Sequence, residues 1–347
     1  MYDPDILLTL LFRGLTNGAI YAFLALGIVV LYSVTSVINV AQGEFVMLSA
    51  LSVASFQRAQ VPGTLYLVVT GLVLWALADG VRYALSGRHR KALVRLALLP
   101  AAVLLYLGVS WAATTGLGYP LQVLLAVGLV TLLGPVCYRL MVQPLPRASV
   151  LVFLILTIGL HLALTGLGLA FWGPQPYSLP PFAAGGTRLG GVYLSYQSLW
   201  VLAIAALVMV LLYLFFEQTI YGKALRAAAV NRLGARLSGI SAVRSGSISF
   251  TLSVFLSAIA GILITPITKM VYDFGFLLGL KGFVGAVIGG LVHPGLAAAG
   301  ALFVGVAEQF SAFYISSAYK DVLVFLLIIP VLLIRSLQHQ DFEEHVE

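Results

Sequence analysis

The sequence predicts an all-α polytopic membrane protein, a single domain over residues 1–347 built as a bundle of about 10–11 transmembrane helices. Of its 347 residues, 61% are hydrophobic and only 9% are charged, and its mean hydropathy is +1.05. Apolar runs of about twenty residues, the length that crosses a bilayer as a helix, recur from end to end. Helices are favoured over a membrane barrel because barrel strands alternate apolar and polar residues, whereas the run Leu199–Phe216 is apolar on every face.

The predicted crossings follow these apolar runs. The first begins in Met1–Gly14, where acidic residues stand in place of the basic ones of a secretory signal, so we expect it to be retained as a span. The segment 275–291 either crosses fully or is re-entrant. In chain order the crossings are expected near residues 6–33, 37–57, 65–84, 96–113, 119–138, 149–171, 197–216, 245–267, 275–291, 296–313 and 321–336.

Basic residues indicate the orientation in the membrane. They cluster in Val81–Arg95, Tyr138–Arg147 and Gly222–Arg244, and the crossings between these segments come in pairs, which places all three on one side. With Arg335 they hold thirteen of the 19 Lys and Arg residues, so the positive-inside rule assigns that side to the cytoplasm. The N-terminus is then outside and the C-terminus inside. The net charge of +7 follows from this asymmetry and does not indicate a nucleic-acid partner.

A polar stretch interrupts the apolar sequence at the second crossing. Its unusual residues are Asn39, Gln42, Gly43 and Glu44. If the crossing begins near Val37, the Glu44 carboxylate lies about 10 Å along the helix, where a charge costs roughly 2.5–3.5 kcal/mol. Two interpretations stay open: the carboxylate caps a helix broken at Gly43 or bonds a neighbouring helix, or it lines a translocation path.

The basic segment within residues 217–244 has an apolar stripe. The spacing of Ala227, Val230, Leu233, Leu237 and Ile240 predicts one short amphipathic helix, with Arg226, Arg232 and Arg236 elsewhere around it. Such a helix needs a surface for its apolar side, either the membrane or the groove of another protein. The composition favours neither.

A row of small residues follows later in the chain. Gly279, Gly282, Gly285 and Gly289 recur at spacings that predict a flat helix face for close packing against another helix. The charged residues Lys281, Glu308, Lys320 and Asp321 are interpreted as lying near span ends, where snorkelling or local pairing stabilises a charge.

No pattern in the sequence indicates an enzyme. The one Gly-Lys pair, Gly222-Lys223, is followed by Ala224, so the chain has no phosphate-binding loop of the Walker type. It has no Gly-x-Ser-x-Gly elbow and no metal-ligand constellation. Cys137 is the single cysteine, so no disulfide forms within the chain. We expect no catalytic residue, cofactor or metal.

Three long blocks resemble the membrane permeases of branched-chain amino-acid ABC importers. Leu15–Leu48 looks like their first block, Gly222–Ile240 like the loop that docks on the ATPase, and Gly279–Phe325 like their C-terminal block. With Tyr138–Arg147 the resemblance covers roughly residues 15–57 and 138–337. Two features depart from the family pattern: residues 64–118 look like an inserted helix pair, and Gln42 stands where the family commonly carries His.

The resemblance implies roles for both polar segments. Asn39, Gln42, Gly43 and Glu44 would line the substrate path. The segment Gly222–Ile240 would bind in a groove of the ATPase. It would transmit the nucleotide-driven closure of the ATPase pair to the membrane-spanning helices. Its implied coupling residues are Gly222, Arg226, Ala227, Val230, Leu233, Leu237, Gly239 and Ile240.

The resemblance also implies partners and a location. These are ATPase subunits that supply the energy, a second homologous permease subunit or a second copy, a periplasmic or extracellular substrate-binding protein, and the bilayer of a bacterial or archaeal cytoplasmic membrane. Urea or a short amide is the alternative substrate. Outside the family, the alternatives are a structural scaffold and an ion-coupled secondary transporter, for which Glu44 and His161 are the candidate intramembrane relay residues.

Overall fold

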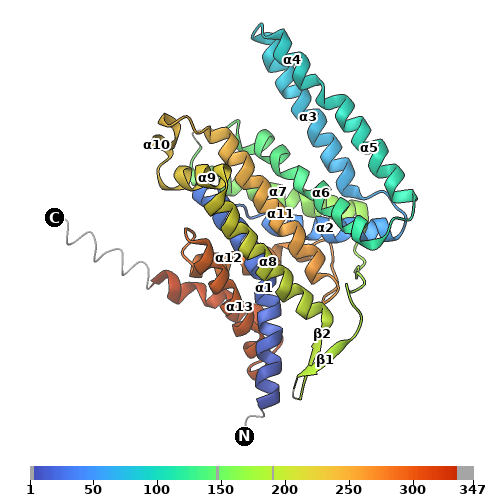
Figure 1. The fold of residues 1–347 in the computed structure, drawn as a ribbon, viewed down its shortest axis with the longest axis vertical. Helices are drawn as coiled ribbons and strands as arrows, with labels where there is room; N and C mark the ends of the chain where they lie inside the picture. Colours follow the sequence, from blue (N-terminus) through green and yellow to red (C-terminus); the bar gives the residue numbers. More distant parts are fainter. Residues whose placement is uncertain (1–3, 146–147, 190, 334–347) are drawn as a thin grey trace, which may run out of the picture.

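The computed structural model describes residues 4–145, 148–189 and 191–333, and most of them are helical (Figure 1). Eight helical segments of this described chain are long and apolar enough to cross a membrane, which confirms the predicted fold class. The elements are α1 (Pro4–Thr35), α2 (Gln42–Gln57), α3 (Gly63–Leu85), α4 (His89–Leu96), α5 (Leu98–Thr114), α6 (Tyr119–Cys137), the π-helical turn η1 (Tyr138–Val142), α7 (Val150–Trp172), β1 (Gly186–Leu189), β2 (Val192–Ser195), α8 (Tyr196–Gln218), α9 (Ile220–Val230), α10 (Arg232–Leu237), α11 (Ala242–Ile264), α12 (Phe274–Ile288), α13 (Pro294–Tyr314) and α14 (Lys320–Leu326).

Two of the predicted crossings correspond to shorter helices: α2 has 16 residues and α12 has 15. In the predicted crossing 321–336, α14 has 7 residues, and after a turn at residue 327 the chain is helical again at 328–333. The prediction that the second crossing begins near Val37 is wrong, because the chain turns at Ser36, whose φ is 56°, and helix resumes only at Gln42. The end of the predicted crossing 321–336, with Arg335, lies outside the described residues.

The basic segments share one end of the molecule. Figure 1 shows α4, α9 and α10 at the top and the N-terminus with the β1–β2 hairpin at the bottom. The hairpin pairs Gly186 with Ser195, and Tyr177 bridges Met270 in the α11–α12 connection. The hairpin lies in the connection between the predicted crossings 149–171 and 197–216.

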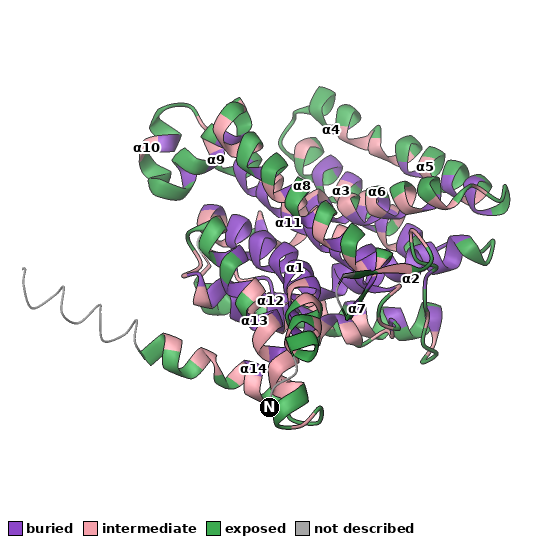
Figure 2. Cartoon of the chain, turned by 60° about the horizontal axis from the view of Figure 1, so that its bottom comes forward, coloured by how far each residue is buried: buried purple, intermediate pink, exposed green. Residues whose placement is uncertain are grey.

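Burial divides the helices into an inner and an outer set. In the most apolar 18-residue stretch of α1, 83% of the residues are buried, whereas in the corresponding stretches of α7 and α8 the shares are 17% and 11%. All three are apolar on every face, but α1 is surrounded by protein while α7 and α8 face outward. Figure 2 shows buried residues concentrated on α1, α2 and α11, and exposed ones on α4, α5 and α10.

Glycines bring the inner helices into close contact. Gly18 of α1 and Gly305 of α13 face each other with no room for a side chain. The predicted glycine row meets several helices: Gly279 lies against Gly43 of α2, and Gly282 lies against α1. The remaining two, Gly285 and Gly289, lie against Ala301 and Ala297 of α13.

A buried ion network anchors α3, which lies in the segment predicted as inserted. Asp79 is 1% exposed and forms an ion pair with Arg139 of η1. Its carboxylate also lies 3.5 Å from Arg95 of α4 and accepts a hydrogen bond of 2.9 Å from the Trp75 indole. Asp79 is not among the residues singled out from the sequence, although it is the single acidic residue in the run 65–84.

We expect Asp79→Asn to destabilise the protein by roughly 3–5 kcal/mol, because Arg139 would keep a charge without its partner inside the membrane domain. Thermal unfolding in detergent, followed by the reaction of Cys137 with a fluorogenic thiol reagent, measures the change. Glu217→Gln, which breaks the exposed pair with Arg226, is the matched control and should cost less than about 1 kcal/mol. Equal midpoints for Asp79→Asn and the native chain would contradict the anchoring role.

Candidate functional site

The candidate site lies at the N-terminal end of α2, which begins inside the protein. Asn39, Gln42 and Glu44 are 2%, 0% and 0% exposed. Glu44 lies in the first turn of α2, where the positive end of the helix dipole stabilises a carboxylate. The chain reaches this depth as non-helical backbone, and Thr157 of α7 donates a hydrogen bond of 3.0 Å to the carbonyl of Ile38. Such backbone is tolerated within a membrane only where protein or a wet cavity surrounds it.

Glu44 forms a polar cluster with α7. Its Oε1 lies 2.8 Å from Nδ1 of His161, and the Thr165 hydroxyl lies 3.3 Å from the same nitrogen. The His161 ring stacks on Phe276 of α12, with centroids 4.4 Å apart. Glu44 Oε2 is buried and has no hydrogen-bond partner among the described residues. The cluster therefore offers one carboxylate oxygen to a donor beside an aromatic ring.

Gln42 has a different environment from Glu44. Its amide nitrogen donates to the carbonyl of Ser253 at 2.9 Å and to the hydroxyl of Ser257 at 2.6 Å. Its oxygen accepts from the Ser253 hydroxyl at 2.8 Å and from Asn39 Nδ2 at 3.2 Å. All of the hydrogen-bonding capacity of this amide is used within the protein. Gln42 thus ties α2 to α11.

The helices α2 and α12 approach each other most closely at Gly43. A Cβ at this position would overlap the carbonyl of Gly275. The four residues predicted to line a path are therefore brought together at one end of α2, but their contacts differ. Gly43 packs against backbone, and the Gln42 amide has all of its hydrogen bonds within the protein. Glu44 keeps one oxygen without a hydrogen-bond partner in the part of the chain that the structure describes.

The predicted docking segment forms two short helices, so the prediction of one continuous amphipathic helix is wrong. Asn231 between α9 and α10 is extended, with φ −148°, and its side chain accepts a hydrogen bond of 2.9 Å from the Gly234 amide. Asn is a favoured N-cap residue because its side-chain oxygen satisfies an amide at the start of a helix. The break turns α10 relative to α9.

The break changes which side chains face outward. Val230, Leu233 and Leu237 are 88%, 68% and 82% exposed, and Ala227 is exposed as well. Leu225, Ala228 and Ala235 are buried beside Val34, with Ile240 packed against them. The other predicted coupling residues are placed as follows: Arg226 pairs with Glu217, Gly222 packs on the backbone of Phe215 and Phe216, and Gly239 has φ +84°.

A second buried ion cluster joins four helices. Lys281 Nζ lies 2.8 Å from Glu308 Oε1 and 2.7 Å from Asp321 Oδ1, and the Tyr21 hydroxyl donates to Glu308 Oε2 at 2.6 Å. The interpretation of Lys281 as a span-end charge is wrong, because it lies near the middle of α12 and is 7% exposed. Its pairing with Glu308 compensates the charge within the bundle.

No metal centre accompanies these clusters. Within the part of the chain that the structure describes, no group of three or more His, Cys, Asp or Glu side chains is arranged to hold a metal ion.

Comparison with known proteins places this arrangement in a family. The family model described as branched-chain amino acid transport system / permease component matches residues 10–332. The chain belongs to this family. The resemblance stated from the sequence is thereby confirmed. Because the family is one of transport permeases, this permease is a transport protein and not a catalytic enzyme.

Individual relatives agree with the family. The high-affinity branched-chain amino acid transport system permease protein BraD of Pseudomonas aeruginosa is 28% identical over 331 residues, which cover 94% of this chain and 92% of BraD. The corresponding protein LivH of Escherichia coli K12 is 26% identical over 332 residues, 93% of this chain and 92% of LivH. A probable branched-chain amino acid transport permease protein LivH of the archaeon Methanocaldococcus jannaschii is 30% identical over 138 residues, 38% of this chain and 44% of that protein. No solved structure matches the permease.

Proposed function

We propose that this permease is the membrane subunit of an importer that moves branched-chain amino acids across the cytoplasmic membrane and draws its energy from ATP hydrolysed by separate subunits. The observation that carries the proposal is the family match over residues 10–332. Two features of the chain support it: the exposed apolar side chains of α9 and α10, and the absence of a Walker phosphate loop from the sequence. A substrate-binding protein and a second permease subunit or copy complete the proposed assembly.

The docking segment is the proposed contact with the ATPase. Val230, Leu233 and Leu237 present a small apolar surface at the Lys- and Arg-rich end of the bundle. A groove on a cytoplasmic partner would remove this surface from water, as grooves do when they accept an amphipathic helix. Arg236 is an exposed residue of the same segment and suits a partner with an acidic residue at the rim of the groove.

α11 is the proposed mechanical link to the site. It begins at Ala242, just after α10, and Ser253 lies roughly 17 Å further along it at about 1.5 Å per residue. There the Gln42 amide holds α11 to the start of α2. A displacement of α10 by the ATPase would therefore move the start of α2, and with it Glu44, as one packed unit. In this account Gln42 is a coupling residue and not a substrate contact.

Glu44 is the proposed transient substrate contact. A branched-chain amino acid carries an ammonium group and an apolar side chain. The ammonium suits the carboxylate oxygen that has no partner among the described residues, and the apolar side chain suits the ring of Phe276, which stacks on His161. Weak binding is expected, because a site on a conduction path must release what it binds.

The first test is of energy supply. The purified permease alone is expected to hydrolyse no more ATP than a membrane protein that has no nucleotide-binding subunit. Adding the purified ATPase subunits from the same genome should yield a stable complex whose ATP turnover rises when substrate-loaded binding protein is present. ATP turnover by the permease alone would contradict the proposal, and uptake by the permease alone driven by a proton gradient would support the secondary transporter instead.

A further inference from the structure

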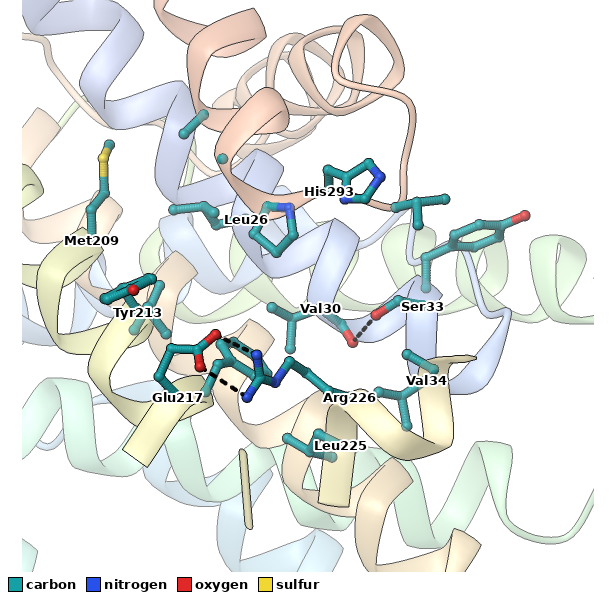
Figure 3. Close-up of a pocket in the computed structure, with 18 of the residues that line it drawn as sticks. Leu26, Val30, Ser33, Val34, Met209, Tyr213, Glu217, Leu225, Arg226 and His293 are labelled. Atoms are coloured by element: carbon teal, nitrogen blue, oxygen red, sulfur yellow. Dashed lines mark hydrogen bonds and ion pairs between the residues drawn. The ribbon is translucent and has the colours of Figure 1, made fainter. Parts of the chain in front are cut away.

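A large apolar cleft adjoins the docking segment and lies apart from the cluster at the start of α2. It has a volume of about 890 Å³ and lies between α8 and α13, with the second half of α1 as its floor (Figure 3). Most of the lining is apolar, including Leu26 and Val30 of α1, Met209 and Tyr213 of α8, and Ala298 and Leu302 of α13. α9 closes one end through Leu225 and Arg226. We call this cavity the α8–α13 cleft.

The depth of the α8–α13 cleft matches one leaflet of a bilayer. Along its floor it extends from Leu26 to Ser36, which is about 15 Å of helix. The hydrocarbon core of a bilayer is about 30 Å thick. The cleft therefore begins at the Lys- and Arg-rich end of the bundle and reaches about the middle of the membrane.

Cations flank the rim of the cleft, beyond the Glu217–Arg226 pair that belongs to the lining itself. Arg232 donates a hydrogen bond of 2.7 Å to the Ser36 hydroxyl at the end of the floor, and His293 lines the other side. Lys223 lies one turn before Arg226 on α9, on the same face of the helix. Glu217 pairs with Arg226, and no acidic residue occurs from residue 218 to residue 244. Lys223 and Arg232 are thus cations without a carboxylate partner in this segment.

We propose that the α8–α13 cleft binds one anionic phospholipid from the leaflet on the Lys- and Arg-rich side of the membrane. Its acyl chains lie along Leu26 and Val30, and its phosphate contacts Lys223, Arg232 and His293. Basic pockets between membrane helices on the cytoplasmic side are suited to acidic headgroups. The lipid would bridge α8, α9 and α13 at the point where the docking segment joins the bundle.

Charge and depth favour a lipid over a protein occupant. From its segments 81–95, 138–147 and 218–244, which contain no acidic residue, a second copy of this chain would offer no carboxylate to Lys223 and Arg232. A cytoplasmic ATPase cannot reach Leu26 or Leu302, which lie deepest in the cleft.

The test is native mass spectrometry of the purified permease titrated with phosphatidylglycerol or phosphatidylcholine. The native chain is expected to retain one phosphatidylglycerol at least about tenfold better than phosphatidylcholine. Lys223→Gln/Arg232→Gln should remove this preference. Ala299→Phe, at an exposed residue that lines the cleft, should reduce retention of both lipids because the phenyl ring would fill space that the acyl chains need.

The matched control is Arg88→Gln/Arg90→Gln, which removes the same charge from exposed residues in and beside α4. It should retain the lipid as the native chain does, and thermal unfolding should show that all variants are folded. Equal retention of the two lipids by the native chain, or equal loss in the control, would overturn the proposal. So would a disulfide between two copies through Ala299→Cys in a Cys137→Ser background, since a second chain would then occupy the cleft.

Discussion

Binding of the ATPase is expected to weaken by roughly a hundredfold when Leu237 or Leu233 is replaced by Asp. An unpaired carboxylate buried in an apolar groove costs about 3 kcal/mol or more, and 1.4 kcal/mol corresponds to tenfold in affinity. The substitutions should leave the fold intact, because these side chains are 82% and 68% exposed in the permease itself. Co-purification of the ATPase and ATP-dependent uptake measure the effect.

Two further substitutions separate docking from folding. Leu93→Asp places the same change on α4, where the side chain is 70% exposed, and should leave ATPase binding unchanged. Ala235→Asp, at a residue that is 6% exposed, should lower the amount of folded permease. If Leu233→Asp and Leu237→Asp both retain the ATPase and transport normally, the exposed side chains of α9 and α10 face lipid headgroups instead.

Uptake is expected to fall about tenfold or more in Glu44→Gln while the fold is kept. The amide has the shape of the carboxylate and is less costly to bury, so the protein should insert normally. What is lost is a charge-assisted hydrogen bond to the substrate ammonium, worth about 1.5–3 kcal/mol. Asp5→Asn, at an exposed carboxylate in the first turn of α1, is the control and should transport normally.

Gly43→Val provides the contrasting result for the same stretch of chain. Because any Cβ at Gly43 overlaps the Gly275 carbonyl, this variant should fail to accumulate as folded protein. Normal uptake by Glu44→Gln together with failure of Gly43→Val would mean that the start of α2 is a packing site alone. The proposal that Glu44 lines the path would then be withdrawn.

The membrane fold could be predicted because it depends on local properties of the sequence. Apolar runs of membrane length and the asymmetry of Lys and Arg are visible without any knowledge of contacts. The break at Asn231 also had a local signal, since Asn is a favoured N-cap residue, but the continuous spacing of Val230, Leu233 and Leu237 was given more weight.

The site depended on contacts that the sequence does not encode locally. Glu44 and His161 were both recognised as intramembrane candidates, yet they are separated by 117 positions, and nothing in their spacing pairs them. The start of α2 at Gln42 depends on Ser253 and Ser257, more than 200 positions away. Lys281 was misplaced for the same reason, because its position in the bundle makes sense only once Glu308 is beside it.

This permease is proposed to carry branched-chain amino acids inward at the expense of ATP hydrolysed by its partners. The most direct measurement is uptake of labelled leucine into proteoliposomes that contain the full complex, with the binding protein outside and ATP inside. Uptake should require ATP, the ATPase and the binding protein. It should be competed by isoleucine and valine but not by urea. Uptake that continues without ATP and follows an imposed proton gradient, or that urea competes while valine does not, would contradict the account.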